Sequence, residues 1–287
     1  MIKINNTKLD VSKFPNNESL IPTELLNSLD KDKRVRIDFK WGEDGDILLL
    51  YFVLAHLNSL DVTKRDMYIH YMPYSRMDRS QNGSCFTLKY TCDLINSVKK
   101  DDNIYVVEPH SDVTLSELGA KRVNLITPLV QKILEENQDI DVICYPDKGA
   151  KARFKDDTVN LPVVYCEKVR DFDTGAIKGL TLVGDIELSG KNVLIVDDLC
   201  SRGGTFYHTA KELKKNGVQG VYLVVCHMES TIRYGEILNN NNLIKHIYAT
   251  DSMLLPMEAY WLQQESGLTI YDLSKFLLEN KLEVQNG

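Results

Sequence analysis

One segment, residues 193–206, constrains the fold more than any other part of the chain. Its sequence is VLIVDDLCSRGGTF: four apolar residues, two acids, a Gly-Gly pair and a threonine, after which a helical pattern continues to residue 216. An apolar, β-branched run that turns directly into a helix is the repeating unit of a parallel sheet covered by helices. The segment therefore predicts an α/β fold.

The same alternation of short β-branched runs and longer amphipathic runs continues through the chain. We expect helices at 47–57, 86–98, 129–136 and 205–216, and strands at 67–71, 104–107, 142–145, 163–166, 193–196, 221–226 and 246–249. The rhythm restarts after 124–128, which predicts two domains, 1–124 and 125–269. Residues 270–287 are expected to form a C-terminal helix that packs on either domain, the N-terminal one included.

Composition excludes several classes of partner. The formal charge of −7 and the pI near 5.5 do not favour binding to nucleic acid or to anionic lipid. No run approaches the roughly 18 apolar residues of a membrane span, and the N-terminus lacks a secretory apolar stretch. The six cysteines show no C-x-x-C pair and suit reduced core positions. We expect a cytoplasmic protein.

Polar residues follow the candidate strands one after another. In an open α/β sheet, ligands bind off the carboxyl ends of the strands. The residues in these positions are Tyr74, Arg76, Asp78, Arg79, Glu108, His110, Asp147, Lys168, Arg170, Asp197 and Asp198. We therefore expect five strand ends to form one site.

The loop within 193–206 has the chemistry of a clamp for a phosphorylated sugar. Gly203 and Gly204 let the backbone close tightly, so that N–H groups of the loop and of the following helix surround an anion. Asp197 and Asp198 would repel a phosphate but suit sugar hydroxyls or Mg²⁺. An ordinary strand-to-helix turn with an acidic cap is the simpler alternative. The order of acids, glycines and Thr205 favours the clamp.

With these residues in place, the loop resembles the ribose-phosphate loop of the phosphoribosyltransferase fold, and the rest of the chain resembles the ribose-phosphate pyrophosphokinases. The matching segments are FPNNE at 14–18, IHYMPYSRMDRS at 69–80, YVVEPHS at 105–111, YPDKGAKAR at 145–153 and CEKVRD at 166–171. They occur in the family's order and cover nearly the whole chain. The resemblance implies two phosphoribosyltransferase-like α/β domains in tandem, with mostly parallel sheets.

The resemblance also implies an activity: transfer of the diphosphate of ATP, with Mg²⁺, to the C1 hydroxyl of a 5-phosphorylated ribose. ATP would lie on Phe14, Asn16, Glu18, Arg76, Asp78, Arg79 and His110, and Mg²⁺ on Glu108, His110 and Asp147. The acceptor would lie on Asp147, Asp197, Asp198, Cys200, Ser201, Arg202, Gly203, Gly204 and Thr205. The catalytic residues would be Lys168, Arg170 and His110, the first two at the start of a mobile loop that contains Gly175 and Gly179. His110 would meet either the metal or a phosphate.

Further implications concern subunits and rival functions. Phe14 and Glu18 would reach the ATP of a neighbouring subunit, so a homo-oligomer, dimeric or larger, is expected. A phosphoribosyltransferase that consumes an activated ribose remains an alternative, because the same loop serves both reactions. A non-catalytic regulatory subunit is a second alternative, which the presence of Lys168 and Arg170 disfavours.

Two residues depart from the family pattern. Ser201 stands where the family has an acid, and Arg202 stands where it has a threonine. Together they make the 5-phosphate pocket more positive by about two charges. This favours an acceptor with a second phosphate, namely ADP-ribose, which would give ADP-ribose 1-pyrophosphate for rebuilding NAD. The order Cys-Ser-Arg-Gly-Gly also resembles a viral branch with that activity. Ribose 5-phosphate is the alternative acceptor.

Overall fold

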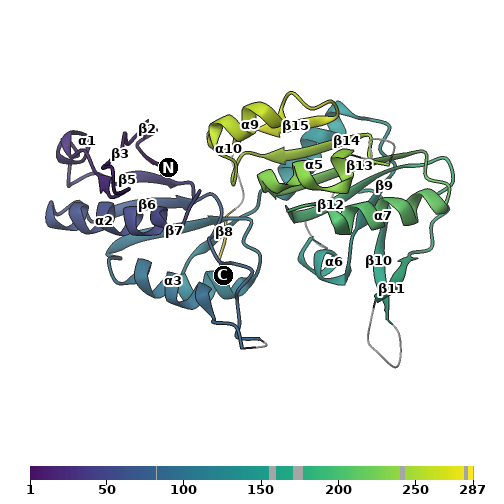
Figure 1. The fold of residues 1–287 in the computed structure, drawn as a ribbon, viewed down its shortest axis with the longest axis horizontal. Helices are drawn as coiled ribbons and strands as arrows, with labels where there is room; N and C mark the ends of the chain where they lie inside the picture. The colour runs from purple at the N-terminus through teal and green to yellow at the C-terminus, as the bar shows by residue number, and fades with distance from the viewer. Residues whose placement is uncertain (82, 155–159, 171–176, 240–242, 281–283, 287) are drawn as a thin grey trace. The chain divides into compact units, whose positions relative to one another are not determined.

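The computed structural model divides into two compact units (Figure 1). Unit 1 holds Met1–Asn124 and the C-terminal strand, and unit 2 holds Leu125–Asn280. The structure describes residues 1–81, 83–154, 160–170, 177–239, 243–280 and 284–286, with the backbone alone at 168–170, 177–178 and 285–286. Within this described part of the chain, no helix is both long enough and apolar enough to cross a membrane.

Unit 1 is built on a seven-stranded sheet in the order β16-β8-β7-β6-β5-β1-β2. Strands β5 to β8 are parallel, whereas β1, β2 and β16 pair antiparallel at the two edges. The strands are β1 (Ile2–Ile4), β2 (Thr7–Lys8), β5 (Val35–Phe39), β6 (Lys64–Ile69), β7 (Asp101–Val107), β8 (Lys121–Val123) and β16 (Val284–Asn286). The helices are α1 (Glu24–Asn27), α2 (Gly45–Ser59), α3 (Thr87–Asn96) and α4 (Asp112–Leu118).

Alternation along the strands decides which face of this sheet is covered. Ile37 and Met67 are buried with the apolar side chains of α2, α3 and α4 in one core. The neighbouring residues point to the opposite face, as the period of two requires. There the guanidinium of Arg36 lies 3.9 Å above the ring of Tyr68, which stacks on Tyr105 with ring centres 4.7 Å apart. Helices therefore cover one face, and stacked polar side chains line the other.

Unit 2 has a second seven-stranded sheet, in the order β11-β10-β9-β12-β13-β14-β15. All neighbouring strands are parallel except the hairpin of β10 and β11. The strands are β9 (Val142–Tyr145), β10 (Val163–Arg170), β11 (Ile177–Val183), β12 (Asn192–Cys200), β13 (Gly220–Met228), β14 (His246–Thr250) and β15 (Leu268–Tyr271). The helices are α5 (Ile126–Glu136), α6 (Lys148–Phe154), α7 (Gly204–Lys215), the 3-10 helix η1 (Ser230–Tyr234), α8 (Glu236–Asn239), α9 (Pro256–Leu262) and α10 (Leu273–Glu279).

The centre of this sheet is apolar on both faces. All nine residues of β13 are buried, as expected for a parallel strand with helices on either side. Val193 and Ile195 of β12 share a core with α7, while Leu194 and Val196 on the opposite face are equally buried. The expected α/β class with mostly parallel sheets is thus confirmed.

The β10–β11 hairpin differs from the sequence expectations. Strand β10 runs to Arg170 instead of ending at 166, because β11 pairs with it beyond the apolar run. Gly179 consequently lies in β11 and not in a loop. Residues 171–176, which include Gly175 of the expected mobile loop, lie outside the described residues.

The C-terminal segment forms three elements where one helix over 270–287 was expected. Residues up to Tyr271 join the sheet of unit 2 as β15. Asp272 then caps α10 by accepting a hydrogen bond from the backbone N–H of Lys275 at 2.9 Å. Helix α10 belongs to unit 2, whereas β16 pairs with β8 in unit 1, placing Val284 opposite Val123.

A buried ion pair joins the strands and helices of unit 1. The guanidinium of Arg65 is fully buried and donates to both carboxylate oxygens of Asp102, at 2.5 and 2.7 Å. It also donates to the carbonyl oxygens of Leu54 and Val98 and to the side chain of Asn58. All its hydrogen-bonding directions are used, so removing one partner leaves a buried charge without compensation.

We predict that Asp102→Ala destabilises the protein by about 3–5 kcal/mol, the usual cost of breaking a buried pair. Asp101→Ala is the matched control: Asp101 is 64% exposed and pairs with Arg34 at 3.1 Å, and such a surface pair contributes about 0–1 kcal/mol. Urea unfolding of both variants measures the difference. Equal losses in the two variants would contradict the assignment.

Candidate active site

Two adjacent carboxylates end the central strand of unit 2. Asp197 and Asp198 lie in β12, which stays paired with β13 as far as Cys200, four residues past the expected strand end at 196. The side chain of Asp198 is 6% exposed and that of Asp197 19%. Arg153 of α6 faces them, with Nη1 at 2.7 Å from Asp198 and 4.0 Å from Asp197. One guanidinium thus bridges two nearly buried acids.

The protonation of this pair follows from its surroundings. Burial raises the pKa of Asp197 well above its ordinary value, and the neighbouring charge of Asp198 raises it further. The charge of Arg153 and the backbone N–H of Asp198 act in the opposite direction but are smaller causes. The ionised pair is therefore an electrostatically unfavourable arrangement that a bound cation or sugar hydroxyls would relieve.

Arg153 did not emerge from the sequence patterns as a site residue. It stands six residues after Asp147, in the last turn of α6, within the same YPDKGAKAR segment. Because positions 147 and 153 are not one helical turn apart, their spacing alone does not point to a common ligand. A search for basic residues in the last turn of helices next to paired acids could have found it.

The Gly-Gly turn opens α7 beside these carboxylates. Gly203 has a positive φ of 77°, and a side chain there would meet Ile237 at 2.4 Å, so only glycine fits. Gly204 begins the helix and no other atom lies near the place of its missing side chain. The first N–H groups of α7 have no hydrogen-bond partner within the helix, and no side chain caps the helix by accepting from them. Such N–H groups can bind an anion, and the expected role of this turn in holding a phosphate stays a prediction.

The other end of the same loop is backed by the segment after β13. The hydroxyls of Ser201 and Thr231 donate to Oε2 of Glu229, at 2.7 and 3.0 Å. Arg202 is exposed, and the missing side chain of Gly235 would strike its backbone carbonyl. Glu229 therefore supplies a carboxylate where the family pattern has an acid at 201. The expected gain of about two positive charges at 201 and 202 did not include this carboxylate, which contacts Ser201.

Cys200 takes a different place from the one expected. Its side chain is fully buried in the core of unit 2, and burial together with the charges of Asp197 and Glu229 raises the pKa of its thiol. Only its backbone remains for an acceptor. Thr205 is exposed in the first turn of α7 and stays available to a phosphate.

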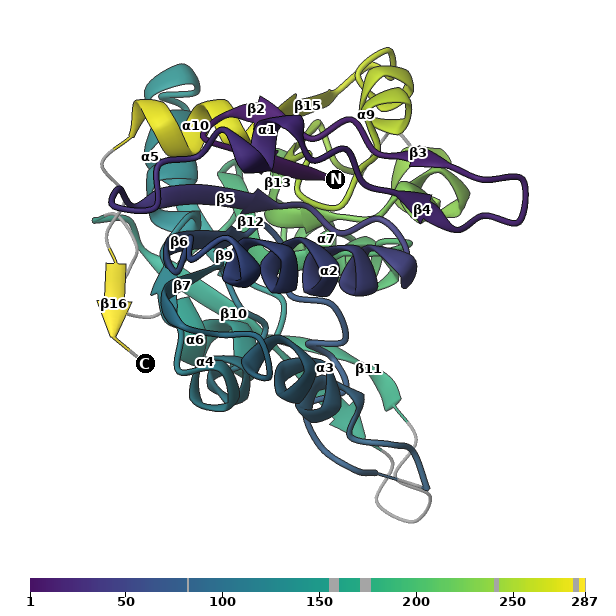
Figure 2. The ribbon, with the colours of Figure 1, turned by 90° about the vertical axis from the view of Figure 1, so that its left-hand side faces the viewer.

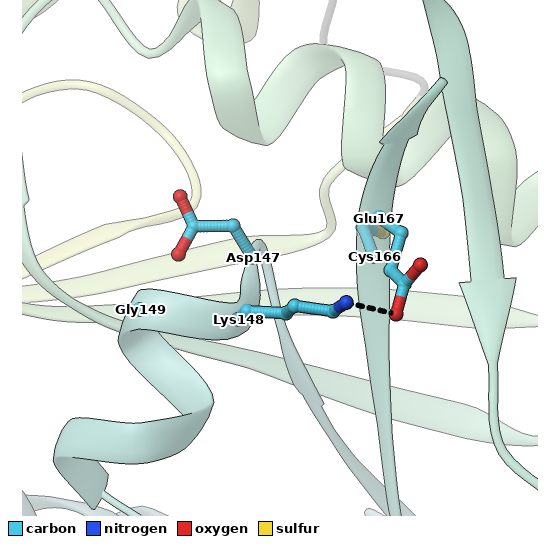
Figure 3. Close-up of a pocket in the computed structure, with 5 residues that line it drawn as sticks. All are labelled: Asp147, Lys148, Gly149, Cys166 and Glu167. Carbon is cyan, nitrogen blue, oxygen red and sulfur yellow. Dashed lines mark ion pairs between the residues drawn. The ribbon is translucent and has the colours of Figure 1, made fainter. Parts of the chain in front are cut away.

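A pocket lies at the start of α6 (Figure 3). It is lined by Asp147, Lys148, Gly149, Cys166 and Glu167. Oδ1 of Asp147 accepts the backbone N–H of Ala150 at 3.0 Å, so this carboxylate caps α6. Lys148 pairs with Glu167 at 2.9 Å, and Figure 3 shows Asp147 pointing away from that pair. Asp147 thus presents its second oxygen on the side of the pocket away from Lys148.

In unit 1, the candidate ATP residues follow β6. Tyr74 has a positive φ of 61° and its hydroxyl donates to Asp44 at 2.6 Å, which pins the start of this loop. Arg76 is exposed, and Asp78 accepts from Nε of Arg79 at 3.1 Å. The side chain of Arg79 is itself 69% exposed. The loop thus presents two arginines to solvent.

The residues after β7 divide into two kinds. Glu108 is 2% exposed and its carboxylate accepts from Arg122 at 3.2 Å, an internal pairing. Its expected role as a magnesium ligand stays a prediction, and the ion would have to compete with Arg122 for this carboxylate. His110 is partly exposed in the loop that leads to α4.

The remaining ATP candidates lie on a hairpin of β3 (Ser12–Lys13) and β4 (Ser19–Leu20). Figure 2 shows this hairpin projecting from unit 1. Phe14 is 50% exposed and its N–H donates to the carbonyl of Glu18 at 2.9 Å. Asn16 accepts from the N–H of Glu18 at 3.2 Å, which shapes the turn. Phe14 and Glu18 are therefore both displayed at the tip.

The expected magnesium set is divided between the units. His110 belongs to unit 1 and Asp147 to unit 2. In the part of the chain that the structure describes, no three His, Cys, Asp or Glu side chains group to hold a metal. The oxygens of Asp147, Asp197 and Asp198 are nevertheless the donors that Mg²⁺ prefers. The side chains of Lys168 and Arg170 lie outside the described residues; their backbones end β10.

We predict that Asp197→Asn stabilises the protein. The raised pKa means that ionised Asp197 opposes folding above that pKa, and the penalty vanishes below about pH 4, where folded and unfolded chains are both protonated. The variant should raise the midpoint of thermal unfolding near neutral pH by roughly 2–4 °C, the shift from about 1 kcal/mol. Exposed Asp185→Asn is the control. A gain that persists unchanged at low pH would rule out this explanation.

Comparison with known proteins agrees with this geometry. A family model described as "Phosphoribosyl transferase domain" matches residues 115–261, just over half of the chain. The ribose-phosphate pyrophosphokinase of Sulfurisphaera tokodaii is 28% identical over 284 residues, which cover 96% of this chain and 91% of that protein. The enzyme of the same name from Pyrococcus furiosus is 26% identical over 257 residues, 88% of each chain.

A solved structure shares the fold over almost the whole chain. The phosphoribosylpyrophosphate synthetase of Mycobacterium smegmatis superimposes with a TM-score of 0.74 at 17% identity, covering 95% of this chain and 88% of that one. The matched family model includes both Asp197 and Asp198 and the Gly-Gly turn after them. The chain therefore belongs to the phosphoribosyl transferase domain family and, within it, is an enzyme of the ribose-phosphate pyrophosphokinase type.

Proposed function

We propose that the chain transfers the β,γ-diphosphate of ATP to the C1 hydroxyl of a ribose phosphorylated on C5, releasing AMP, with ribose 5-phosphate as the first acceptor. One observation carries this proposal: the pair Asp197 and Asp198 near the end of β12 is followed, after residues 199–202, by a glycine turn that opens α7. The names of the curated relatives support the same acceptor.

The acceptor site follows from the geometry of unit 2. The carboxylates of Asp197 and Asp198 would accept hydrogen bonds from the ribose hydroxyls, and the first N–H groups of α7 would hold the 5-phosphate. Nη1 of Arg153 lies 2.7 Å from Oδ1 of Asp198. Sugar hydroxyls would therefore meet the pair beside this guanidinium.

The chemistry needs alignment and charge neutralisation more than a base. The C1 oxygen attacks the β-phosphorus, the bond from that phosphorus to the α-phosphate oxygen breaks, and the hydroxyl proton leaves to solvent. Bound Mg²⁺ would neutralise the diphosphate charge, with Asp147 as one of its oxygen ligands. Arg76 and Arg79, exposed after β6, would hold ATP.

We propose that Lys168 and Arg170 contact the diphosphate group while it is transferred. Both stand near the tip of the β10–β11 hairpin, where the pairing shifts in register between Val169 and Arg170. Cations at this tip would meet the negative charge that builds up during transfer. His110, the third expected catalytic residue, would contact a phosphate, because Mg²⁺ prefers oxygen ligands.

Replacing either cation should lower turnover more than ATP affinity. We predict that Lys168→Ala and Arg170→Ala each reduce kcat by roughly 10²–10³-fold, because a lost transition-state contact acts on kcat. Lys191→Ala is the control, since Lys191 pairs with Asp141 at 3.3 Å at the opposite end of β12. AMP release at saturating ATP is the measurement. Near-normal kcat in both variants would remove these residues from the mechanism.

The subunit arrangement is part of the proposal. Phe14 and Glu18 are exposed at the tip of the β3–β4 hairpin, away from the core of unit 1. We infer that they reach the ATP of a neighbouring copy in a homo-oligomer. A cytoplasmic location fits the six cysteines, none of which forms a disulfide in the described chain.

ADP-ribose is a second candidate acceptor, favoured by the exposed side chain of Arg202. A guanidinium next to the 5-phosphate loop offers a planar fork of donors to a second phosphate. Mass analysis of the products formed from ATP and Mg²⁺ with ribose 5-phosphate or with ADP-ribose tests both proposals. If AMP forms without a pyrophosphorylated sugar, or if no turnover occurs, the proposed transfer fails. The phosphoribosyltransferase and the regulatory subunit then remain as alternatives.

A single substitution tests the part played by Arg202. We predict that Arg202→Thr lowers kcat/KM for ADP-ribose by at least roughly tenfold relative to ribose 5-phosphate, since one charged hydrogen bond contributes about 1.5–3 kcal/mol. Arg233→Thr, at an exposed position of η1, is the matched control. Both ratios are measured at one salt concentration. If the two variants behave alike, Arg202 has no special role.

A further inference from the structure

The pocket at the start of α6 is crossed by one ion pair. Lys148, the first residue of α6, places its Nζ 2.9 Å from Oε1 of Glu167 in β10. Figure 3 shows the lysine side chain extending from the helix to the strand, with Asp147 directed the other way. The pocket measures about 310 Å³, near the lower end of the range for ligand sites. Among the described residues that line it, Lys148 is the one cation.

The two members of this pair are exposed enough to separate at low cost. The side chain of Lys148 is 70% exposed and that of Glu167 37%. Such a pair contributes little to stability, because water solvates both charges. Oε1 of Glu167 also accepts from the hydroxyl of Tyr165 at 3.0 Å. Lys148 can therefore leave Glu167 for another anion without removing the last hydrogen bond of this carboxylate.

A second lysine of α6 is held in a different way. Lys151 lies three residues later, with Nζ 3.9 Å from the centre of the Tyr165 ring. The face of the aromatic ring attracts this ammonium, and Lys151 is not among the residues that line the pocket. Of the two lysines, Lys148 alone thus places its charge in the pocket and has an anionic partner that a ligand could replace.

We propose that Lys148 is a substrate-binding residue that exchanges Glu167 for an oxygen of the diphosphate group of ATP. The proposal rests on the proposed transfer of that group. Asp147, the proposed oxygen ligand of the accompanying Mg²⁺, lines the same pocket, so the diphosphate enters beside Lys148. The ammonium sits on a long, flexible side chain and carries three donors. Glu167 holds it at the pocket before the ligand arrives and competes for it afterwards.

The two partners of the pair should therefore have opposite effects on diphosphate binding. Lys148→Ala removes a donor and should weaken the binding of inorganic pyrophosphate at least roughly tenfold, as expected for one charged hydrogen bond. Glu167→Gln removes the competing charge and should strengthen binding roughly threefold, the effect of one unit charge at about 6 Å in water. If the pair only linked α6 to β10, both variants would lose the same contact and change the affinity in the same direction.

Calorimetric titration with inorganic pyrophosphate and Mg²⁺ at one salt concentration measures these affinities. Lys148→Arg keeps the charge and should stay within about threefold of the wild type. Lys151→Ala is the matched control, because it removes the same charge from the same helix outside the pocket, and it should stay within the same limit of about threefold. A loss in Lys151→Ala as large as in Lys148→Ala would overturn the proposal in favour of a general effect of charge.

The outcomes also distinguish this inference from the proposed function. If the wild-type protein releases AMP with ribose 5-phosphate, but Lys148→Ala and Glu167→Gln shift the pyrophosphate affinity in the same direction or not at all, the assignment of Lys148 is wrong and the transfer stands. If the two variants shift the affinity in opposite directions but the wild-type protein releases no AMP with a phosphorylated ribose, the diphosphate contact stands and the proposed function fails.

Discussion

The site depends on the placement of two neighbouring carboxylates at the end of a buried strand. Asp197 and Asp198 cannot both be ionised there without help, because burial and mutual repulsion act on the same pair. Arg153 provides part of that help from α6, at 2.7 Å from Asp198. The rest must come from a ligand that donates protons or brings positive charge. The position of α6 against β12, and with it the start of the neighbouring pocket, follows from this demand.

A second constraint is the tight contact behind the phosphate loop. Gly203 approaches Ile237 so closely that a side chain would collide at 2.4 Å, and Gly235 likewise packs against the backbone of Arg202. The segment after β13 therefore supports the loop through the side chain of Ile237 and the backbone at Gly235. A phosphate site made of backbone N–H groups needs such support, because its donors can be positioned only through the backbone. Substitutions at 235 or 237 would act on acceptor binding through this contact.

The sequence predicted those features that apolar runs and local turn chemistry control. The buried strands, the order of the helices and the acid and glycine loop all follow from such local signals. Arg153 and Glu229 could not be predicted in this way, since each meets the loop through tertiary packing from a segment with no distinctive pattern. The expected charge of the 5-phosphate pocket therefore left Glu229 out. The strand ends of β10 and β12 were misjudged because pairing with a neighbouring strand extends a strand through polar residues.

The chain has a net charge of −7, so the proposed binding of two polyanions would require its cations and N–H groups to be concentrated where the phosphates lie. The guanidinium of Arg153 is paired with Asp198 and lies near Asp197, so it adds little net positive charge for binding a phosphate. The first turn of α7 carries no side-chain cap and thus offers backbone dipoles that no carboxylate neutralises. In the proposed acceptor site, affinity for the 5-phosphate would rest on these backbone donors, while the side chains around the loop would influence which acceptor binds. Changes in those side chains can alter the acceptor while the backbone site stays the same.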